Sequence, residues 1–292
     1  MPEGDTVYRT AHRLDQALGR DVLTTVDLRW PDLSTLDLAG RSTLEVVPRG
    51  KNILHRIEGD VTIHSHLRME GQWRVEHPQD VGPRRLADQQ LRAVVGTERW
   101  TALGLRLGDL HVVATSQEHT LVGHLGPDVL GSDWDPDEAV RRLLASPTTI
   151  GAALLDQSNL AGVGTMYAAE TLFLERVPPW TPAAELGRER VAGVVERAHR
   201  LLDRGKEGAV QVTTGREARG EWHFVHARSG RPCLRCGTTV RVAMIGDPPR
   251  ERTMFYCPHC QGGIGPTDDG SPQRPLGSQG RGGPRRTYRP RR

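Results

Sequence analysis

The stretch 154-LLDQSNLAGVGTMYAAE-170 decides the fold, because a glycine-rich turn interrupts two apolar patterns of helical spacing. The first pattern follows a capping Thr148 or Thr149 and the second begins at Thr165. The pattern therefore predicts a helix, a tight turn over 159–164 and a second helix, which Pro178 and Pro179 end. The apolar residues that carry the two patterns are Ile150, Ala153 and Leu154, then Met166, Ala169, Phe173 and Val177.

The glycines of this turn allow two interpretations. Gly162 and Gly164 let backbone N–H groups approach an anion, such as a DNA phosphate, at the positive end of the second helix. Alternatively, they only permit a sharp turn in a helical hairpin, and the pattern alone favours this second interpretation.

The region before this stretch is rich in short β-type runs. An amphipathic helix is predicted from Asp5 to Leu18, ended by Gly19. Several short strands with turn signals then predict a sandwich or flattened barrel. The runs are STLEVV, NILHRI, VTIHSHLRM, GQWRV, LRAVV, RWTALGLRL and LHVVAT, and a helical segment opened by SDWDPDEAV follows them.

All four cysteines lie after the helical region, as two C-x2-C pairs. Cys233 and Cys236 are separated by 20 residues from Cys257 and Cys260. This spacing predicts a four-thiolate structural zinc site rather than two disulfides or free thiols. The residues between the pairs read as strand, turn and strand, so we expect a zinc-bound β-hairpin. Arg252 on this hairpin suits a phosphate, but spacing alone is equally compatible with an ordinary solvated arginine.

Charge is concentrated at the end of the 292-residue chain. The whole sequence has 39 basic and 36 acidic residues, whereas 264–292 holds seven arginines and two aspartates. This segment is rich in Gly, Pro and Ser, so it is predicted to be disordered. It serves either as an electrostatic tether to nucleic acid or as a solvated tail without a role.

No apolar run approaches the about 20 residues of a membrane span, and no signal peptide is evident. We therefore expect a soluble cytoplasmic protein.

Five motifs, in this order, resemble the bacterial formamidopyrimidine-DNA glycosylase and endonuclease VIII family. They are PEG at 2–4, RGK ending at Lys51, HLRMEG at 66–71, LLDQSNLAGVGTMYAAE at 154–170 and RTMFYCPHCQ at 252–261. The resemblance covers nearly the whole chain except the tail. It implies an α+β fold with an N-terminal β-sandwich and helix, a helix–two-turn–helix domain and a C-terminal zinc-finger β-hairpin. The expected domains are 1–130, 131–222 and 223–263, followed by the basic tail 264–292.

The resemblance also implies catalytic roles. Pro2, exposed once Met1 is trimmed, is the nucleophile that attacks C1′ of the deoxyribose, and an α-amine has a usable neutral fraction near pH 7. Glu3 is the general acid and base. Lys51 meets the phosphate on the lesion side.

The same resemblance implies a DNA-binding set. Met69 matches the apolar wedge that fills the gap left by an extruded base. Arg252 matches the zinc-finger arginine that grips phosphate, and Glu170 a glutamate near the lesion pocket. Thr165 stands where the family usually has a phosphate-binding Asn, and Thr6 where most members have Glu. Both departures leave Pro2 and Glu3 in place, so activity is expected.

The favoured function is therefore a bifunctional DNA glycosylase and abasic-site lyase. The PEG sequence is closer to the endonuclease VIII branch, which implies oxidised pyrimidines. The alternatives are a glycosylase for oxidised purines and a DNA-damage binding protein without chemistry. One structural Zn²⁺, damaged double-stranded DNA as partner, a monomeric state and a location at the bacterial nucleoid complete the expectation.

Overall fold

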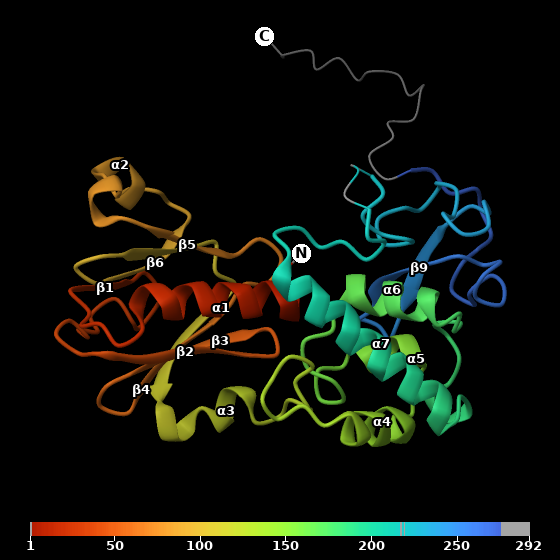
Figure 1. The fold of residues 1–292 in the computed structure, drawn as a ribbon, viewed down its shortest axis with the longest axis horizontal. Coiled ribbons are helices and arrows are strands. Elements are labelled where there is room, and N and C mark those ends of the chain that lie inside the picture. The colour runs from red at the N-terminus through yellow and green to blue at the C-terminus, as the bar shows by residue number, and fades with distance from the viewer. Residues whose placement is uncertain (1, 217, 219, 276–292) are drawn as a thin grey trace, which may run out of the picture.

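The computed structural model of the chain describes residues 2–216, 218 and 220–275. Figure 1 shows two lobes side by side, with the N-terminal half of the chain in one lobe and the C-terminal half in the other. Helix α1 runs along the first lobe and points its N-terminal end at the second. None of the helices in the described ranges is long and apolar enough to span a bilayer.

The first lobe is a β-sandwich with α1 (Gly4–Leu18) packed on it. One antiparallel sheet has the strand order β1-β6-β7-β5 and the other has the order β2-β3-β4-β8. The strands are β1 (Thr25–Leu28), β2 (Thr43–Arg49), β3 (Asn52–Ile57), β4 (Val61–His66), β5 (Gln72–Glu76), β6 (Leu91–Gly96), β7 (Thr101–Leu105) and β8 (Asp109–Ala114). The predicted sandwich is confirmed.

The core of this lobe follows from the two periodicities in its sequence. The apolar face of α1, carried by Val7, Ala11, Leu14 and Leu18, is buried against the sheets. Alternate residues of the strands enter the same core, as Ile53 and Ile57 do from β3 and Ile63 from β4. Short helices lie outside it, namely α2 (Pro83–Leu86) after β5 and α3 (His119–Val122) after β8, with 3-10 turns at Pro78–Asp80 and Thr115–Gln117.

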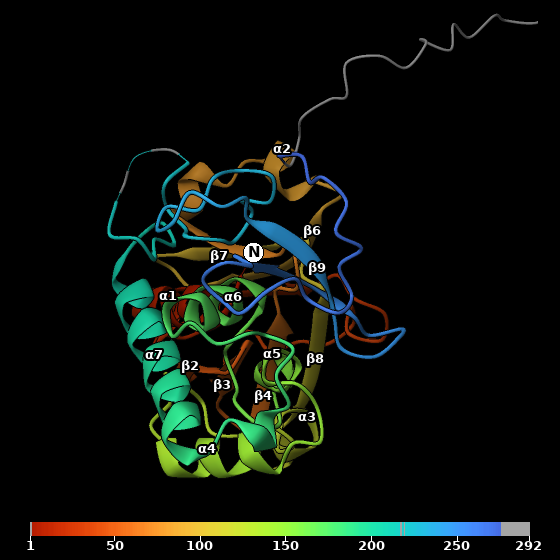
Figure 2. The same cartoon turned by 90° about the vertical axis from the view of Figure 1, so that its right-hand side faces the viewer.

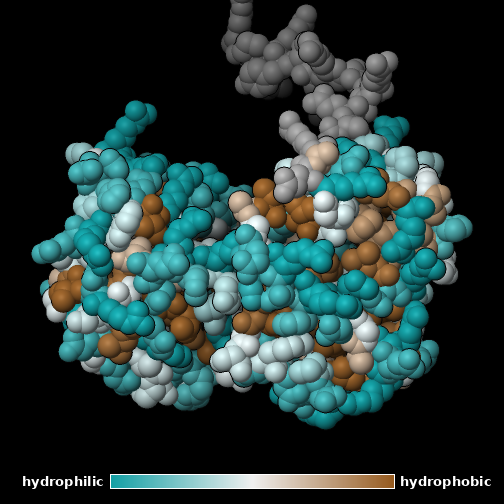
Figure 3. All heavy atoms as spheres, in the orientation of Figure 1, coloured by the Kyte–Doolittle hydropathy of each residue, from teal (hydrophilic) through white to brown (hydrophobic). Residues whose placement is uncertain are grey.

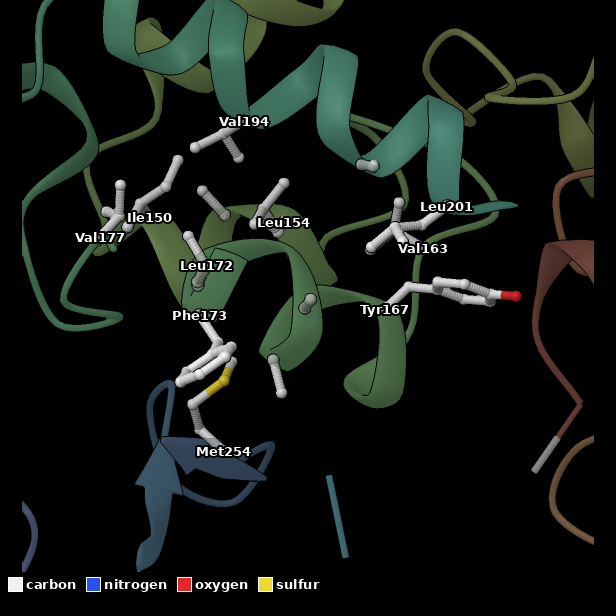
Figure 4. Packing of buried hydrophobic residues seen from close by; sticks show 14 of the residues in the cluster. Ile150, Leu154, Val163, Tyr167, Leu172, Phe173, Val177, Val194, Leu201 and Met254 are labelled. Carbon is white, nitrogen blue, oxygen red and sulfur yellow. The ribbon is translucent and has the colours of Figure 1, made fainter. Parts of the chain in front are cut away.

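The second lobe contains the predicted helical hairpin. It consists of α4 (Pro136–Ala145), α5 (Ile150–Leu155), α6 (Thr165–Leu174), a 3-10 turn at Ala183–Glu185 and α7 (Arg188–Glu207). Helix α6 begins at Thr165 as predicted, but it ends at Leu174, ahead of Pro178. Figure 4 shows its side chains Leu172 and Phe173 in a core with Ile150 and Leu154 of α5 and Val194 of α7. Helix α6 is buried on nearly all sides, and this explains its apolar sequence.

The predicted hairpin is formed by β9 (Arg241–Ile245) and β10 (Arg252–Tyr256), which pair antiparallel. It shares the core of the helical lobe, because Met254 and Phe255 of β10 pack with the residues of α6 (Figure 4). The hairpin is therefore an extension of the helical lobe rather than an independent module.

The segment from Ile264 differs from the sequence-based prediction. It was expected to be disordered throughout, but residues 264–275 pack against the hairpin through polar contacts. The composition of this segment shows that it can bury little apolar surface. It does not show that a neighbouring strand edge and the buried Arg241 will bind the polar groups of the segment. The remaining residues of the predicted tail, 276–292, lie outside the described residues.

Candidate active site

The centre of the site is the carboxylate of Glu3, which lies at the N-terminus of α6. It accepts hydrogen bonds from the backbone N–H groups of Gly164 at 2.7 Å, Met166 at 2.8 Å and Tyr167 at 3.3 Å. Its side chain is buried, with 1% exposure. The first N–H groups of a helix have no partner within the helix and carry partial positive charge, so they form a ready site for an anion.

Gly164 is a glycine because the carboxylate occupies the space of a side chain. A Cβ at this position would lie 2.5 Å from Cδ of Glu3, closer than atoms can pack. The sequence left open whether the turn binds an anion or only bends sharply. In the structure the turn binds a carboxyl group, and this group is the protein's own Glu3 rather than a DNA phosphate.

Lys51 is the charged partner of Glu3. Burial raises the pKa of Glu3 above its usual range, while the charge of Lys51 and the three amide hydrogen bonds oppose the shift. Burial lowers the pKa of Lys51; the charge of Glu3 opposes this shift, and the charge of Arg252 adds to it. The pKa of Glu3 and the pKa of Lys51 thus shift toward each other.

The turn that carries Lys51 is held by Asp128 from the segment between the lobes. The backbone N–H of Gly50, which has a φ of +58°, donates to Oδ2 of Asp128 at 2.6 Å. Leu130 N–H donates to Oδ1 at 3.1 Å, and the Asp128 side chain is almost fully buried. Burial raises the pKa of this carboxyl above its usual range. Sequence reasoning missed Asp128, because its partner Gly50 lies 78 residues away.

Glu170, which the resemblance places near a lesion pocket, is a buried residue of α6. Its carboxylate has no exposed surface and accepts hydrogen bonds at 2.8 Å from the N–H groups of Phe224, Val225 and His226, and a further one from the Thr213 hydroxyl. It therefore faces a segment of its own chain instead of the surface. In this geometry the carboxylate holds the backbone of residues 224–226.

The segment held by Glu170 lines a cavity near the N-terminus of the chain. The cavity measures about 530 Å³ and includes Trp222, His223 and His226 among its walls. Burial, the neighbouring His223 and the N-terminal charge together lower the pKa of His226 to about 3. Its imidazole is thus neutral at physiological pH. Pro2 is partly buried and directly precedes Glu3 in the chain.

His66, at the end of β4, is a second residue that sequence reasoning missed. Its Nδ1 accepts the backbone N–H of Arg68 at 2.9 Å, so the neutral ring carries its proton on Nε2. Burial and the charges of Arg68 and Lys51 lower its pKa to about 4. His66 is therefore a neutral hydrogen-bond donor close to Lys51. Its place in the HLRMEG motif was the signal that could have identified it.

Met69 lies in the connection between β4 and β5, with an exposed fraction of 67%. The two residues beside it, Arg68 and Glu70, are both paired. Arg68 forms an ion pair with Asp109 at 2.6 Å, and Glu70 one with Arg106 at 3.1 Å. Met69 is thus the exposed apolar side chain of this connection, between two residues that are engaged in ion pairs. A side chain that enters a duplex as a wedge would have to be exposed in this way.

Arg252 is exposed at the start of β10, and its NH1 donates to the backbone oxygens of Arg250 and Glu251. It borders a groove of about 710 Å³ between the hairpin and the end of α5, which Asp156 and Gln157 also line. Thr165, the first residue of α6, is partly exposed. Figure 3 shows that the surface is deeply hollowed between the two lobes.

Thr6 lies beside a buried carboxylate that belongs to Asp5. Asp5 is fully buried and accepts from Nε2 of Gln211 at 2.9 Å, and the Thr6 hydroxyl lies 3.4 Å from the same carboxylate. Position 6 therefore lacks the family's usual carboxylate, while the preceding residue, Asp5, has one. The Asp5 carboxylate is turned inward, towards α7 and Gln211.

The four cysteines come together as their spacing predicts. The sulfurs of Cys233, Cys236, Cys257 and Cys260 all lie within 4.8 Å of one another. Tetrahedral zinc with Zn–S bonds of about 2.3 Å separates its sulfurs by about 3.8 Å, so this donor set fits one metal ion. None of the four is in a disulfide.

Comparison with known proteins extends these observations. The formamidopyrimidine-DNA glycosylase N-terminal domain model matches residues 1–101, and the H2TH domain model of the same family matches residues 125–215. The chain is 49% identical over 274 residues to "Probable endonuclease 8 2" of Streptomyces coelicolor, covering 92% of this chain and 97% of the relative. It is 39% identical to "DNA-(apurinic or apyrimidinic site) lyase Nei2" of Mycolicibacterium smegmatis, covering 89% and 99% of the two chains.

The fold also matches solved structures. A formamidopyrimidine-DNA glycosylase from Thermus thermophilus superposes with a TM-score of 0.73 at 28% identity, covering 90% of this chain and all of that one. The Lactococcus lactis enzyme bound non-covalently to DNA with an abasic site has a TM-score of 0.74 at 22% identity, covering 89% and 100%. This chain therefore belongs to the formamidopyrimidine-DNA glycosylase and endonuclease VIII family.

Proposed function

We propose that the protein is a bifunctional base-excision repair enzyme, a DNA glycosylase and abasic-site lyase, in which Pro2 and Glu3 perform the chemistry. The observation that carries this proposal is the buried carboxylate of Glu3, which three amides at the N-terminus of α6 fix and on which the charge of Lys51 acts. A carboxyl with a raised pKa beside an amine nucleophile has the two groups that Schiff-base chemistry on a sugar requires.

In the first half of the reaction, the neutral amine of Pro2 forms a bond to C1′ of the damaged nucleotide. The C1′–N bond to the base breaks, and its electron pair leaves with the base. Glu3 gives its proton to the ring oxygen O4′, which opens the sugar and leaves a C1′ iminium on Pro2. A secondary amine forms this iminium directly, once its single proton is lost.

In the second half, the iminium accepts electrons from C2′. A base removes a proton from C2′, the C3′–O bond breaks and the 3′ phosphate leaves with that electron pair. Water then adds to C1′ and releases Pro2. Glu3, now ionised, is well placed to accept and return protons, because Lys51 and the α6 amides stabilise its charge.

We propose that Lys51, His66, Thr165 and Arg252 bind the phosphates around the lesion, with DNA in the hollow between the lobes (Figure 3). These groups come from both lobes and from the hairpin, so a bound phosphate would join all three parts. Met69 would fill the gap that the extruded base leaves in the duplex. Its apolar side chain is exposed, so it would give up little contact within the protein when it enters the DNA.

The four cysteines are proposed to hold one structural Zn²⁺, which supplies no chemistry but closes the hairpin on the helical lobe. Oxidised pyrimidines are the proposed substrates, because relatives called endonuclease 8 are 38–49% identical to this chain. Relatives called formamidopyrimidine-DNA glycosylase are 29–32% identical.

We further propose that the chain acts as a monomer at the bacterial nucleoid. Its proposed parts are a catalytic sandwich at 1–130, a DNA-binding helical part at 131–222, a zinc finger at 223–263 and a basic tail at 264–292. The ordered packing of 264–275 on the hairpin places the start of that tail against the zinc finger.

Borohydride trapping tests the nucleophile. Reduction of the iminium should fix the protein to abasic-site DNA, with the adduct mapped to a peptide beginning at Pro2. If the adduct maps to Lys51, or if an N-terminally blocked protein still traps DNA, the proposed role of Pro2 is wrong.

A panel of duplexes, each with a single lesion, tests the substrate class. Release of oxidised pyrimidines should exceed release of oxidised purines. Retention of Met1, seen in the intact mass, together with an absence of strand cleavage would instead identify a DNA-damage binding protein.

A further inference from the structure

Residues 264–275, here called the strap, follow the last cysteine and run beside β9 (Figure 2). Among the described strands, β10 alone pairs with β9, so the other edge of β9 has no strand partner. On that edge, the Gln273 amide accepts from Val242 N–H and donates to Val242 C=O, both at 2.8 Å. The Thr267 hydroxyl donates to Met244 C=O at 2.5 Å. Side chains of the strap thus satisfy this edge of the hairpin as a third strand would.

A buried ion pair fixes the strap at the cysteine end of the hairpin. The Asp268 carboxylate binds the Arg241 guanidinium with both oxygens, and the Tyr256 hydroxyl donates to Asp268 at 2.6 Å. Arg241 and Tyr256 are direct partners in the β9–β10 ladder, and Tyr256 precedes Cys257. The side chains of Arg241 and Asp268 are 10% and 1% exposed. Charge-assisted contacts of this kind are stronger and more specific in geometry than exposed ion pairs.

The strap also joins the hairpin to the helical lobe. Gly265 lies against the ring of Trp180, where an added Cβ would be 2.6 Å from the ring. Gly265 N–H donates to the Tyr256 hydroxyl at 3.0 Å, and the rings of Trp180 and Tyr256 meet edge to face with centroids 4.8 Å apart. Trp180 lies in the connection that follows α6. The strap therefore ties the hairpin to the helical lobe at a point outside the four cysteines.

The other end of the hairpin carries Arg252. Arg252 is the first residue of β10 and pairs with Ile245, which follows the Met244 that the strap binds. The charge of Arg252 lowers the pKa of Lys51, so the two cations lie close enough to act on each other. A two-stranded hairpin is marginally stable by itself. The direction in which Arg252 points therefore depends on the contacts that hold the hairpin.

We propose that the strap is a positioning element for Arg252. It holds the hairpin at the cysteine end, along β9 and on the helical lobe, and so keeps the Arg252 guanidinium where it meets a DNA phosphate. The inference rests on the proposed function, in which Arg252 binds a phosphate near the lesion. It gives residues 264–275 a role in DNA affinity that requires no contact between the strap and DNA.

The contacts of the strap depend on Asp268. Without its carboxylate, the buried Arg241 guanidinium loses its charged partner, and removal of one member of a buried pair is strongly destabilising. A hairpin without the strap still carries Arg252. Its arginine, however, has to be ordered when DNA binds, and this ordering weakens the affinity. Release of the strap should thus weaken the contribution of Arg252 without removing the residue.

A double-mutant cycle tests whether the strap acts through Arg252. Asp268→Asn is made in the wild-type chain and in Arg252→Gln, and Asp269→Asn is made in both as the matched control. Asp269 is the exposed neighbour of the same charge, and its carboxylate accepts a local hydrogen bond from Ser271 N–H. All proteins are full-length. Fluorescence anisotropy measures their affinity for a duplex with a tetrahydrofuran analogue of an abasic site, over a range of salt concentrations.

Arg252→Gln should bind about 10-fold more weakly and reduce the slope of log K against log salt by about 1, as the loss of one phosphate contact does. In the wild-type chain, Asp268→Asn should bind about 3-fold more weakly than Asp269→Asn. In Arg252→Gln, the two aspartate variants should bind equally, because the residue that the strap positions is gone. A general structural loss would weaken binding by the same factor in both chains.

Two measurements show that the intended change was made. Protease should cleave within 264–275 in Asp268→Asn and leave this segment intact in Asp269→Asn. Metal analysis should find equal zinc in both. If the strap of Asp268→Asn stays protected, Gln273→Ala is added to it. If Asp268→Asn loses zinc, Gln273→Ala alone replaces it, because this change keeps the ion pair and the net charge and removes both contacts with Val242.

The outcomes separate this inference from the proposed function. If Arg252→Gln weakens binding but release of the strap does not, or does so equally in both chains, the strap does not position Arg252, while the phosphate role of Arg252 stands. If Arg252→Gln binds as tightly as the wild type, the proposed phosphate role of Arg252 is wrong, and the inference that rests on it is overturned as well.

Discussion

At the residue scale, the proposed chemistry depends on a carboxylate that backbone groups hold in place. Glu3 has three amide donors from α6 and one charged neighbour, Lys51. Amide donors cannot move away or titrate, so they fix the position of the carboxylate whatever its charge. Burial still raises its pKa, so a proton remains available for the sugar at a pH where an exposed glutamate has lost it.

Glu3→Gln should therefore separate the two activities. The amide keeps the shape but cannot cycle a proton, so base release in single-turnover assays should fall by roughly 10² to 10⁴. Cleavage of a ready-made abasic site should fall less, because no glycosidic bond has to be broken. A thermal melt confirms that the variant is folded. Equal losses on both substrates would contradict the assignment of Glu3 as the acid in base release.

Gly164→Ala tests the close approach of α6 to Glu3. The new Cβ would lie 2.5 Å from Cδ of Glu3, so the carboxylate must move or the helix must shift. We expect a destabilisation of about 1–3 kcal/mol and a loss of activity of the same kind as in Glu3→Gln. The control is Gly193→Ala inside α7, where the nearest atom is Oε2 of Glu175 at 3.5 Å. Thermal unfolding should show the control to be neutral or more stable, by up to about 1 kcal/mol; equal melting of both variants would contradict the steric argument.

At the scale of elements, the sequence predicts local structure well and distant partners poorly. The start of α6, the helix α1 and both strands of the hairpin follow from periodicity and turn residues, which are local signals. The residue that fills the N-terminus of α6 could not be predicted, because Glu3 is 161 residues from Gly164. The inward position of Glu170 and the tie between Asp128 and Gly50 were missed for the same reason, since each partner comes from another element.

The hairpin is the element whose stability depends on the cysteines. Cys257→Ser removes one of four sulfurs and should weaken both the hairpin and the binding of DNA, because a closed four-ligand site loses a ligand. Since Met254 joins the hairpin to the core of α6, thermal unfolding of the helical lobe should also shift to lower temperature. Metal analysis of the pure wild type should find one zinc per chain, and a value well below one would contradict the zinc assignment.

At the scale of the whole molecule, the site exists only where the two lobes meet. Gly4 N–H donates to Gly162 C=O at 2.9 Å, and Arg9 NH1 donates to Gly205 C=O at 2.6 Å, so α1 is tied to the helical lobe at both points. Asp128 forms a third tie, because it holds Gly50 of the sandwich from the segment that leads into the helical lobe. Glu3 and the turn that carries Lys51 thus belong to the sandwich but are held by residues from outside it.

Asp128→Asn tests this third tie. In Asp128→Asn, one face of the side chain becomes an NH2 group and opposes a backbone N–H, either that of Gly50 or that of Leu130. The turn with Lys51 should then lose its fixed position, and single-turnover strand cleavage should fall by about 10-fold, with a smaller change in DNA affinity. Asp133→Asn is the control, because Asp133 pairs with Arg49 at the surface and such pairs contribute about 0–1 kcal/mol. Equal activity of the two variants would contradict the positioning role.

The pH dependence of stability gives an independent check on the same carboxyl. Burial raises the pKa of Asp128 in the folded state, so the folded protein binds this proton more tightly than the unfolded chain does. Its contribution is therefore fully present below the unfolded pKa of about 3.9 and decreases as pH rises through the raised folded value. Denaturant unfolding should show the wild type losing stability relative to Asp128→Asn across that window. If the difference in the free energy of unfolding between the two proteins stays constant with pH, the Asp128 carboxyl is solvated in the folded state. The contacts of α1 would then have to hold the two lobes together without it.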